Sequence, residues 1–332
     1  MSEQKRFLHL YETTAEFEAE YNNEETYHEP WVSYVRENSA VTFNKPEEED
    51  LRNIPLTFEI TSDGNITWSC QDFEEYITAG HDIQYKKNDG EWTNMPRTLS
   101  VVAGDTVQFR GDNATYTWDD GLRFDSFMER TSCGFKLKGN IMSLIVSTGF
   151  ATATTLESEH TFYNLFAGCD GLVSAKNLVL PATTLSSRCY ETMFQGCTSL
   201  TETPELPATT LASSCYSGMF EGCTSLTQAP ELPATTLADY CYYNMFEGCT
   251  SLTQAPELPA TTLADYCYNT MFVGCTSLNY VKCLATDISA ADCTYLWLDS
   301  VASSGTFVKA ANMSDWEGGE SGIPVGWTVQ DA

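Results

Sequence analysis

At 332 residues the chain is long enough for two or three domains, and its apolar content of 42% is ordinary for a globular protein. Its 46 acidic residues outnumber its 17 basic residues and give a net charge of −29. Nucleic acids and anionic membranes attract clusters of Lys and Arg, so this charge argues against both as main partners. We expect an acidic, well-solvated surface.

The sequence predicts neither an export signal nor insertion into a membrane. Residues 1–8 lack the apolar stretch that a signal peptide needs. The longest apolar run, residues 141–146, is far shorter than the ~20 residues of a membrane span.

Residues 1–50 form an acidic leader that is too small to build a core alone. We expect a short strand at 7–11, a helical turn or two at 13–21, and a hairpin of strands at 29–35 and 40–44. Such a leader should dock on its own chain or on a partner. Its candidate docking residues are the aromatic side chains Tyr27, Trp31 and Tyr34.

Residues 51–134 are predicted to form a small antiparallel β-sandwich, which we expect to act as a spacer. Residues 56–60 alternate apolar and polar, and residues 65–70 follow a Ser-Asp-Gly turn. Two hairpins are predicted next, one joining 83–87 to 91–93 and one joining 99–102 to 106–110. Several short strands separated by turns are typical of sandwiches of the immunoglobulin-like or fibronectin-like kind.

Two details of this region admit alternatives. An acidic loop offers oxygen ligands for calcium, but its spacing fits no EF-hand and such loops are commonly turns, so we expect no metal. Its acids are Asp112, Asp119, Asp120 and Asp125. Cys70 and Cys133 are expected to be reduced and buried rather than joined.

A 26-residue repeat dominates residues 135–300, and almost four copies of it occur between Leu180 and Leu278. Each copy begins Leu-Pro-Ala-Thr-Thr-Leu, reaches a Cys-Tyr pair, and ends Met-Phe-x-Gly-Cys-Thr-Ser-Leu. A fixed period of this length predicts a solenoid, in which each coil buries its apolar face against its neighbours. The altered first copy and the decaying last copy are expected to cap it, with residues 301–332 adding closing strands as a C-terminal cap.

Each copy is expected to hold one short strand and one short helix. Residues 225–233, with two prolines, should be extended. Residues 236–246 should be helical, with Leu237, Cys241 and Met245 on one inward face and Gly248 as the C-terminal cap. The sequence thus predicts a multidomain, mainly β chain with an α/β solenoid.

The chain has 13 cysteines, nine of them at two repeat positions. No CxxC pair or suitably spaced histidine favours a metal site. We expect columns of buried thiols, with disulfides between coils as the alternative.

The copies differ at a few outward positions and agree at the inward ones. Packing alone explains this, but an exposed tyrosine column also suits recognition, because Tyr gives contact area at a low cost in entropy. The candidate partner-binding residues are Arg188, Tyr240, Tyr243, Tyr266 and Asn269.

The Met-Phe-x-Gly-Cys-Thr-Ser-Leu unit at Met193, Met219, Met245 and Met271 resembles the repeat of BspA-type leucine-rich-repeat proteins. Those are surface adhesins of gut and oral bacteria, and similar repeats occur in phages that infect them. The 26-residue period and the Leu-Pro-Ala-Thr-Thr-Leu segment depart from the shorter common repeat. The leader, with Glu-Pro-Trp-Val-Ser-Tyr at 29–34, resembles N-terminal modules of structural proteins in crAss-like gut phages.

No nucleophile motif, phosphate loop or histidine constellation is present in the sequence, so we expect neither an enzyme nor a cofactor. The resemblance implies a virion structural protein, a head or tail fibre, on the virion surface. It would dock on other virion proteins, bind a host glycan or protein, and form a homo-trimer. The alternatives are a BspA-type adhesin on a bacterial surface and a purely structural capsid decoration protein.

Overall fold

The structure is a computed structural model that describes residues 10–11, 33–37, 40–44, 49–70, 83–113, 126–128, 131–313, 316 and 318–332. The chain divides into two compact units, Met1–Asp50 and Leu51–Ala332. The described residues are mainly β structure, with three short 3-10 helices. Within this part of the chain no helix is long and apolar enough to cross a membrane.

The described residues of the first unit form three strands, β1 (Leu10–Tyr11), β2 (Ser33–Glu37) and β3 (Ala40–Asn44). β2 and β3 pair antiparallel, which confirms the predicted hairpin, and β1 pairs parallel to β2. The helical turns expected at 13–21 lie outside the described residues.

The second unit begins with the 3-10 helix η1 (Leu51–Asn53) and a six-stranded sheet in the order β13-β12-β4-β10-β7-β8. Its strands are β4 (Leu56–Ile60), β7 (Ile83–Lys87), β8 (Thr93–Asn94), β10 (Thr106–Gly111), β12 (Phe135–Asn140) and β13 (Leu172–Val179). Two two-stranded sheets accompany it, pairing β5 (Gly64–Thr67) with β9 (Thr98–Val101) and β6 (Ser69–Cys70) with β11 (Ser126–Phe127).

Aromatic side chains form the core of this region. Phe58 in β4 stacks on Phe135 in β12 at 4.4 Å and meets Phe109 in β10 edge-on at 5.1 Å. Trp68, which follows β5, packs on Phe109 at 5.5 Å and so joins the small β5–β9 sheet to the large one. Because β12 pairs with β4 on one edge and with β13 on the other, this core continues without a break across position 134 into the repeats.

The predicted hairpin between 99–102 and 106–110 is wrong. β9 pairs with β5, whereas β10 lies between β4 and β7, so both edges of β10 are occupied. The turn between β9 and β10 therefore carries the chain from one sheet to another. The other predicted hairpin, β7–β8, is confirmed.

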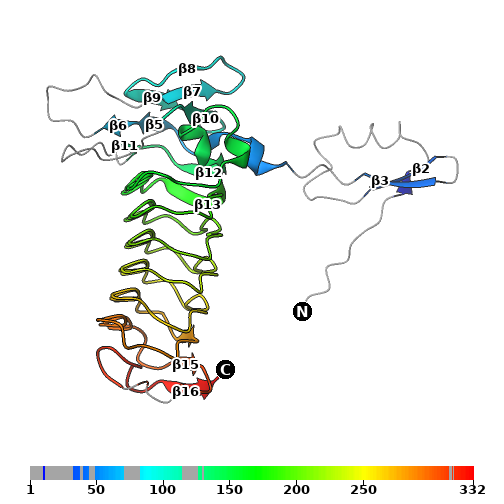
Figure 1. Ribbon diagram of the computed structural model, residues 1–332. Coiled ribbons are helices and arrows are strands. Elements are labelled where there is room, and N and C mark those ends of the chain that lie inside the picture. The colour runs from blue at the N-terminus through cyan, green and yellow to red at the C-terminus, as the bar shows by residue number, and fades with distance from the viewer. Residues whose placement is uncertain are drawn as a thin grey trace. The chain divides into compact units, whose positions relative to one another are not determined.

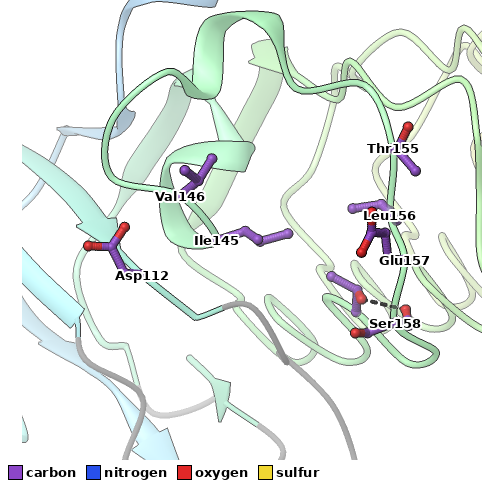
Figure 2. Close-up of a pocket in the computed structure, with 8 residues that line it drawn as sticks. Asp112, Ile145, Val146, Thr155, Leu156, Glu157 and Ser158 are labelled. Atoms are coloured by element: carbon purple, nitrogen blue, oxygen red, sulfur yellow. Dashed lines mark hydrogen bonds between the residues drawn. The ribbon is translucent and has the colours of Figure 1, made fainter.

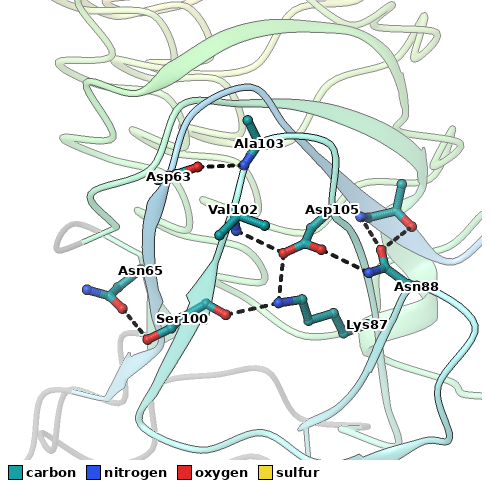
Figure 3. Close-up of polar contacts among 9 residues, drawn as sticks. Asp63, Asn65, Lys87, Asn88, Ser100, Val102, Ala103 and Asp105 are labelled. Carbon is teal, nitrogen blue, oxygen red and sulfur yellow. Dashed lines mark hydrogen bonds and ion pairs between the residues drawn. The ribbon is translucent and has the colours of Figure 1, made fainter.

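Asp105 holds that turn together (Figure 3). Its carboxylate accepts hydrogen bonds from the Val102 backbone N–H at 2.8 Å and the Asn88 amide at 2.9 Å, and it pairs with the Lys87 ammonium at 2.7 Å. The Lys87 hydrogen bond, followed by those of Val102 and Asn88, lowers the pKa of Asp105 to about 2.

After β12 the chain forms the 3-10 helix η2 (Ile141–Leu144) and then η3 (Phe150–Thr152) instead of continuing as a strand. Asn140 causes the change, because its side chain accepts from the Met142 N–H at 3.0 Å and caps η2. The Ser143 hydroxyl then donates to the Phe109 carbonyl at 2.9 Å and ties η2 to the sheet.

Beyond β13 the repeats form a stack of coils that ends at β15 and β16 (Figure 1). The segment predicted to be helical is a run of turns, so that prediction is wrong. Tyr240, Asn244 and Gly248 lie in the left-handed region, with φ of 59°, 54° and 71°. Since this occurs every fourth residue, no helix can propagate, and Gly248 caps none.

The backbone N–H groups in these turns alternate between two kinds of partner. Those of Tyr240, Tyr242 and Phe246 donate to carbonyls of the next coil, 25 residues on, at 2.9–3.1 Å. Those of the intervening residues donate three residues back, as Tyr243 does to Tyr240 at 3.2 Å. Each coil is therefore bonded both internally and to its neighbour, which satisfies the buried backbone without a helix.

Proline explains why the middle coils lack regular strands. β13 and β14 (Tyr280–Cys283) contain no proline and form strands. The corresponding segments at 202–207 and 228–233 each carry two prolines, which have no N–H to donate, and neither is a strand. The strand predicted at 225–233 is therefore wrong.

Buried aromatic rings stack from coil to coil along the inside. One column, Phe194, Phe220, Phe246 and Phe272, has ring spacings of 5.5–5.7 Å. A second, Tyr190, Tyr216, Tyr242, Tyr268 and Trp297, has spacings of 5.8–6.2 Å. The predicted inward Cys, Met and Phe positions are buried, which confirms these columns as core, whereas Leu237 is only half-buried.

The cysteines whose side chains are described are free, buried thiols, including Cys133. Four of them donate to a Phe carbonyl 29 or 31 residues earlier, at 3.0–3.2 Å: Cys197, Cys223, Cys249 and Cys275. Burial raises the pKa of Cys197 and Cys275 to about 12, so these thiols are poor nucleophiles. The side chain of Cys70 lies outside the described residues.

The C-terminal end of the stack is a parallel sheet of β14, β15 (Thr306–Lys309) and β16 (Thr328–Asp331). It confirms the predicted closing strands. Trp297 ends the aromatic column by stacking on Trp316 at 5.4 Å and donating its indole N–H to the Gly322 carbonyl at 3.0 Å.

Candidate functional site

One outward column carries a different residue on almost every coil. Its members are Arg188, Ser214, Tyr240, Tyr266 and Asp292, spaced 26 residues apart. All five lie in the left-handed region, with φ of 45–59°, and the N–H groups of the first four donate to the next coil at 2.9–3.0 Å. The backbone is therefore the same at each level, and only the side chain changes.

A groove of about 700 Å³ follows this column across five coils. All five residues expected at a partner surface line it, although they come from three different coils. Its lining residues are Arg188, Glu191, Ser213, Ser214, Ser217, Tyr240, Tyr243, Tyr266, Asn269, Thr270, Asp292 and Tyr295.

Tyrosine rings form one wall of the groove. Tyr240 and Tyr266 stack with their planes 3° apart and their centres 4.6 Å apart, and Tyr243 packs against Tyr240 at a tilt of 58°. Tyr240 is 39% exposed and Tyr295 is 40% exposed. These rings give the groove a rigid apolar surface with polar edges.

The coil before Tyr240 is hollowed out, because it carries Ser214 and Ser217 where every later coil carries a larger side chain, and Ser213 where the next two coils carry Asp. Ser214 and Ser217 are 7% and 8% exposed and form the floor. The space above these serines lies between Arg188 and Glu191 on one side and the Tyr240 ring on the other. We call this space the serine hollow.

Opposite charges stand together on the far wall of the hollow. Arg188 and Glu191 are 3.8 Å apart, with side chains 52% and 18% exposed. The Glu191 Oε2 atom, which faces the Arg188 guanidinium in this ion pair, is buried and makes no hydrogen bond within the described residues. Burial raises the pKa of the Glu191 carboxyl, and the Arg188 charge only partly opposes this.

At the other end of the groove the negative charge of Asp292 raises the pKa of Tyr266, and Tyr240 makes a smaller contribution in the same direction. The groove therefore offers hydrogen-bond acceptors at both ends and a guanidinium at one.

Glu191, the three serines, Asp292 and Tyr295 were not among the residues predicted for this surface. Asp292 follows Tyr266 by 26 residues, and Tyr295 follows Asn269 by 26, so the repeat period alone identifies both. The decay of the last copy hides that relation. The serines are small, and their importance lies in the space that they leave.

The structure does not bring the predicted docking residues into a described site. Tyr27 and Trp31 lie outside the described residues. Only the backbone of Tyr34 is described, in β2 opposite Phe43.

A second cavity, of about 370 Å³, lies between residues 145–146 and the first coil (Figure 2). Its wall is mostly apolar, and both oxygens of its Asp112 accept hydrogen bonds from Ser147, at 2.7 and 2.9 Å. In the part of the chain that the structure describes, no group of three or more His, Cys, Asp or Glu side chains is placed to hold a metal. The other three acids of the loop considered for calcium lie outside it.

Neither a family model nor a curated protein nor a solved structure matches this chain.

Proposed function

We propose that residues 135–300 are a leucine-rich-repeat solenoid of the BspA type, preceded by a β-sandwich spacer. The stacked columns, the backbone bonds between residues one repeat apart and the altered end coils all support this interpretation. A solenoid of this kind is a scaffold that presents side chains along one face.

Within that class, the protein is a non-enzymatic structural protein of a gut bacteriophage virion, a head or tail fibre. The acidic leader docks on other virion proteins, the chain assembles as a homo-trimer, and the coils face the host surface. The groove across five coils carries the proposal, because it is built from outward positions that vary while the inner columns stay constant.

Three experiments test this proposal. Antibody labelling and imaging of purified particles should place the protein on the virion surface, and a chain without residues 1–50 should fold yet fail to be incorporated. The full chain should also adsorb to the host bacterium. Detection on a bacterial envelope instead would identify an adhesin, and incorporation without adsorption would identify a decoration protein.

A further inference from the structure

The serine hollow is a gap in an otherwise continuous column. Tyr240 stacks on Tyr266 on one side, and on its other side the column position is Ser214, which is too short to cover the ring. The next large side chain in that direction is Arg188, two coils away, or about 10 Å at a coil spacing of ~5 Å. A separation of that size leaves room for one six-membered ring.

The chemistry around the gap specifies what kind of ring. Arg188 supplies hydrogen-bond donors and Glu191 supplies carboxylate acceptors, and the two form an ion pair with 3.8 Å between the Arg188 Nη1 and Glu191 Oε2 atoms. The two charges of this wall cancel, which favours a ligand that has both donors and acceptors but no net charge. The Tyr240 face offers an apolar platform.

We infer that the serine hollow binds one ring of a neutral oligosaccharide, with its C–H face on Tyr240 and its hydroxyl groups toward Arg188, Glu191 and the serine floor. A pyranose chair is thin, has an apolar C–H face and carries hydroxyl groups around its rim, so it meets each requirement. The remaining groove, past Tyr243 and Asn269 to Tyr295, would hold the following sugar units. This inference rests on the proposed function and narrows its ligand to a neutral glycan.

The repeat itself supplies a variant that closes the hollow. Ser214→Tyr places at this position the side chain that Tyr240 and Tyr266 already carry at φ of 59° and 56°, and Ser214 has φ of 54°. The Ser214→Tyr variant should therefore fold, and its new ring should extend the tyrosine stack by one. Tyr240→Ser removes the platform instead, and Ser304→Tyr, at an exposed position outside the groove, is the matched control.

The test is binding of the full chain to immobilised linear tetrasaccharides of glucose, galactose, mannose and N-acetylglucosamine, with tetra-arginine and a sialylated tetrasaccharide as charged probes. We expect at least one neutral tetrasaccharide to bind, with affinity reduced tenfold or more by Ser214→Tyr and by Tyr240→Ser and unchanged by Ser304→Tyr. Glu191→Gln keeps an acceptor, so it should reduce neutral-sugar binding less than threefold.

Binding of the charged probes alone would overturn the inference, as would neutral-sugar binding that both groove variants leave unchanged. Adsorption to host cells without binding of any neutral tetrasaccharide would refute the inference and leave the proposed function standing. If the protein is absent from the particle but binds a neutral sugar, and Ser214→Tyr weakens that binding, the inference stands and the proposed function is refuted.

Discussion

The inner columns of the coils keep the same side chain from coil to coil, whereas the outward column changes its side chain. Inside, Phe194, Phe220, Phe246 and Phe272 repeat without change, with rings 5.5–5.7 Å apart. Outside, Arg188, Ser214, Tyr240, Tyr266 and Asp292 occupy one backbone conformation with four kinds of side chain. The coils thus separate the residues that stabilise the stack from those that can vary without disturbing it.

The largest effect should come from breaking an inner column. Phe220→Ala removes a fully buried ring between two stacked neighbours and leaves a cavity, so we expect a loss of about 3–5 kcal/mol of unfolding free energy. Denaturant unfolding followed by tyrosine and tryptophan fluorescence measures it. A loss below ~1 kcal/mol would contradict the assignment of this column as core.

A smaller effect is expected at the thiol columns. Cys223→Ser should cost about 1–2 kcal/mol, because the buried hydroxyl can keep the bond to the Phe194 carbonyl, now 3.2 Å from the sulfur, but fits the apolar site less well. Cys223→Ala, measured in the same unfolding assay, is the control that removes the donor. Equal stability of all three proteins would show that the bond contributes nothing.

The smallest effect concerns pH and the outward wall. Because burial raises the pKa of Glu191 in the folded protein, its stabilising contribution is complete below the ordinary value of 4.5 and is lost as pH rises through the folded pKa. The unfolding free energy of Glu191→Gln minus that of wild type should therefore be larger at pH 7 than at pH 4. Parallel unfolding curves at the two pH values check this, and the opposite order would mean that the Arg188 pair outweighs burial.

The repeat period predicts the columns correctly because stacking one coil on the next requires identical inward residues. The helix was mispredicted for a specific physical reason. Left-handed residues every fourth position, at Tyr240, Asn244 and Gly248, place Cys241 and Met245 inward with the same spacing of four that a helix would give. Apolar spacing alone cannot separate these two conformations.

The groove was only partly predictable. Variation between copies pointed to Tyr240, Tyr266 and Arg188, but the serine hollow depends on which coils are neighbours and on what is missing between them. Similarly, the turn after β9 looked like a hairpin because sequence shows the turn but not that β4 and β7 already occupy both edges of β10.

The most direct test of this division of roles is adsorption of the full chain to host cells when the outward tyrosines are removed. Tyr240→Ser combined with Tyr266→Ser leaves every inner column intact. We predict that adsorption falls at least tenfold while the unfolding midpoint stays close to that of wild type. Unchanged adsorption by the folded double variant would contradict the claim that the outward column carries recognition.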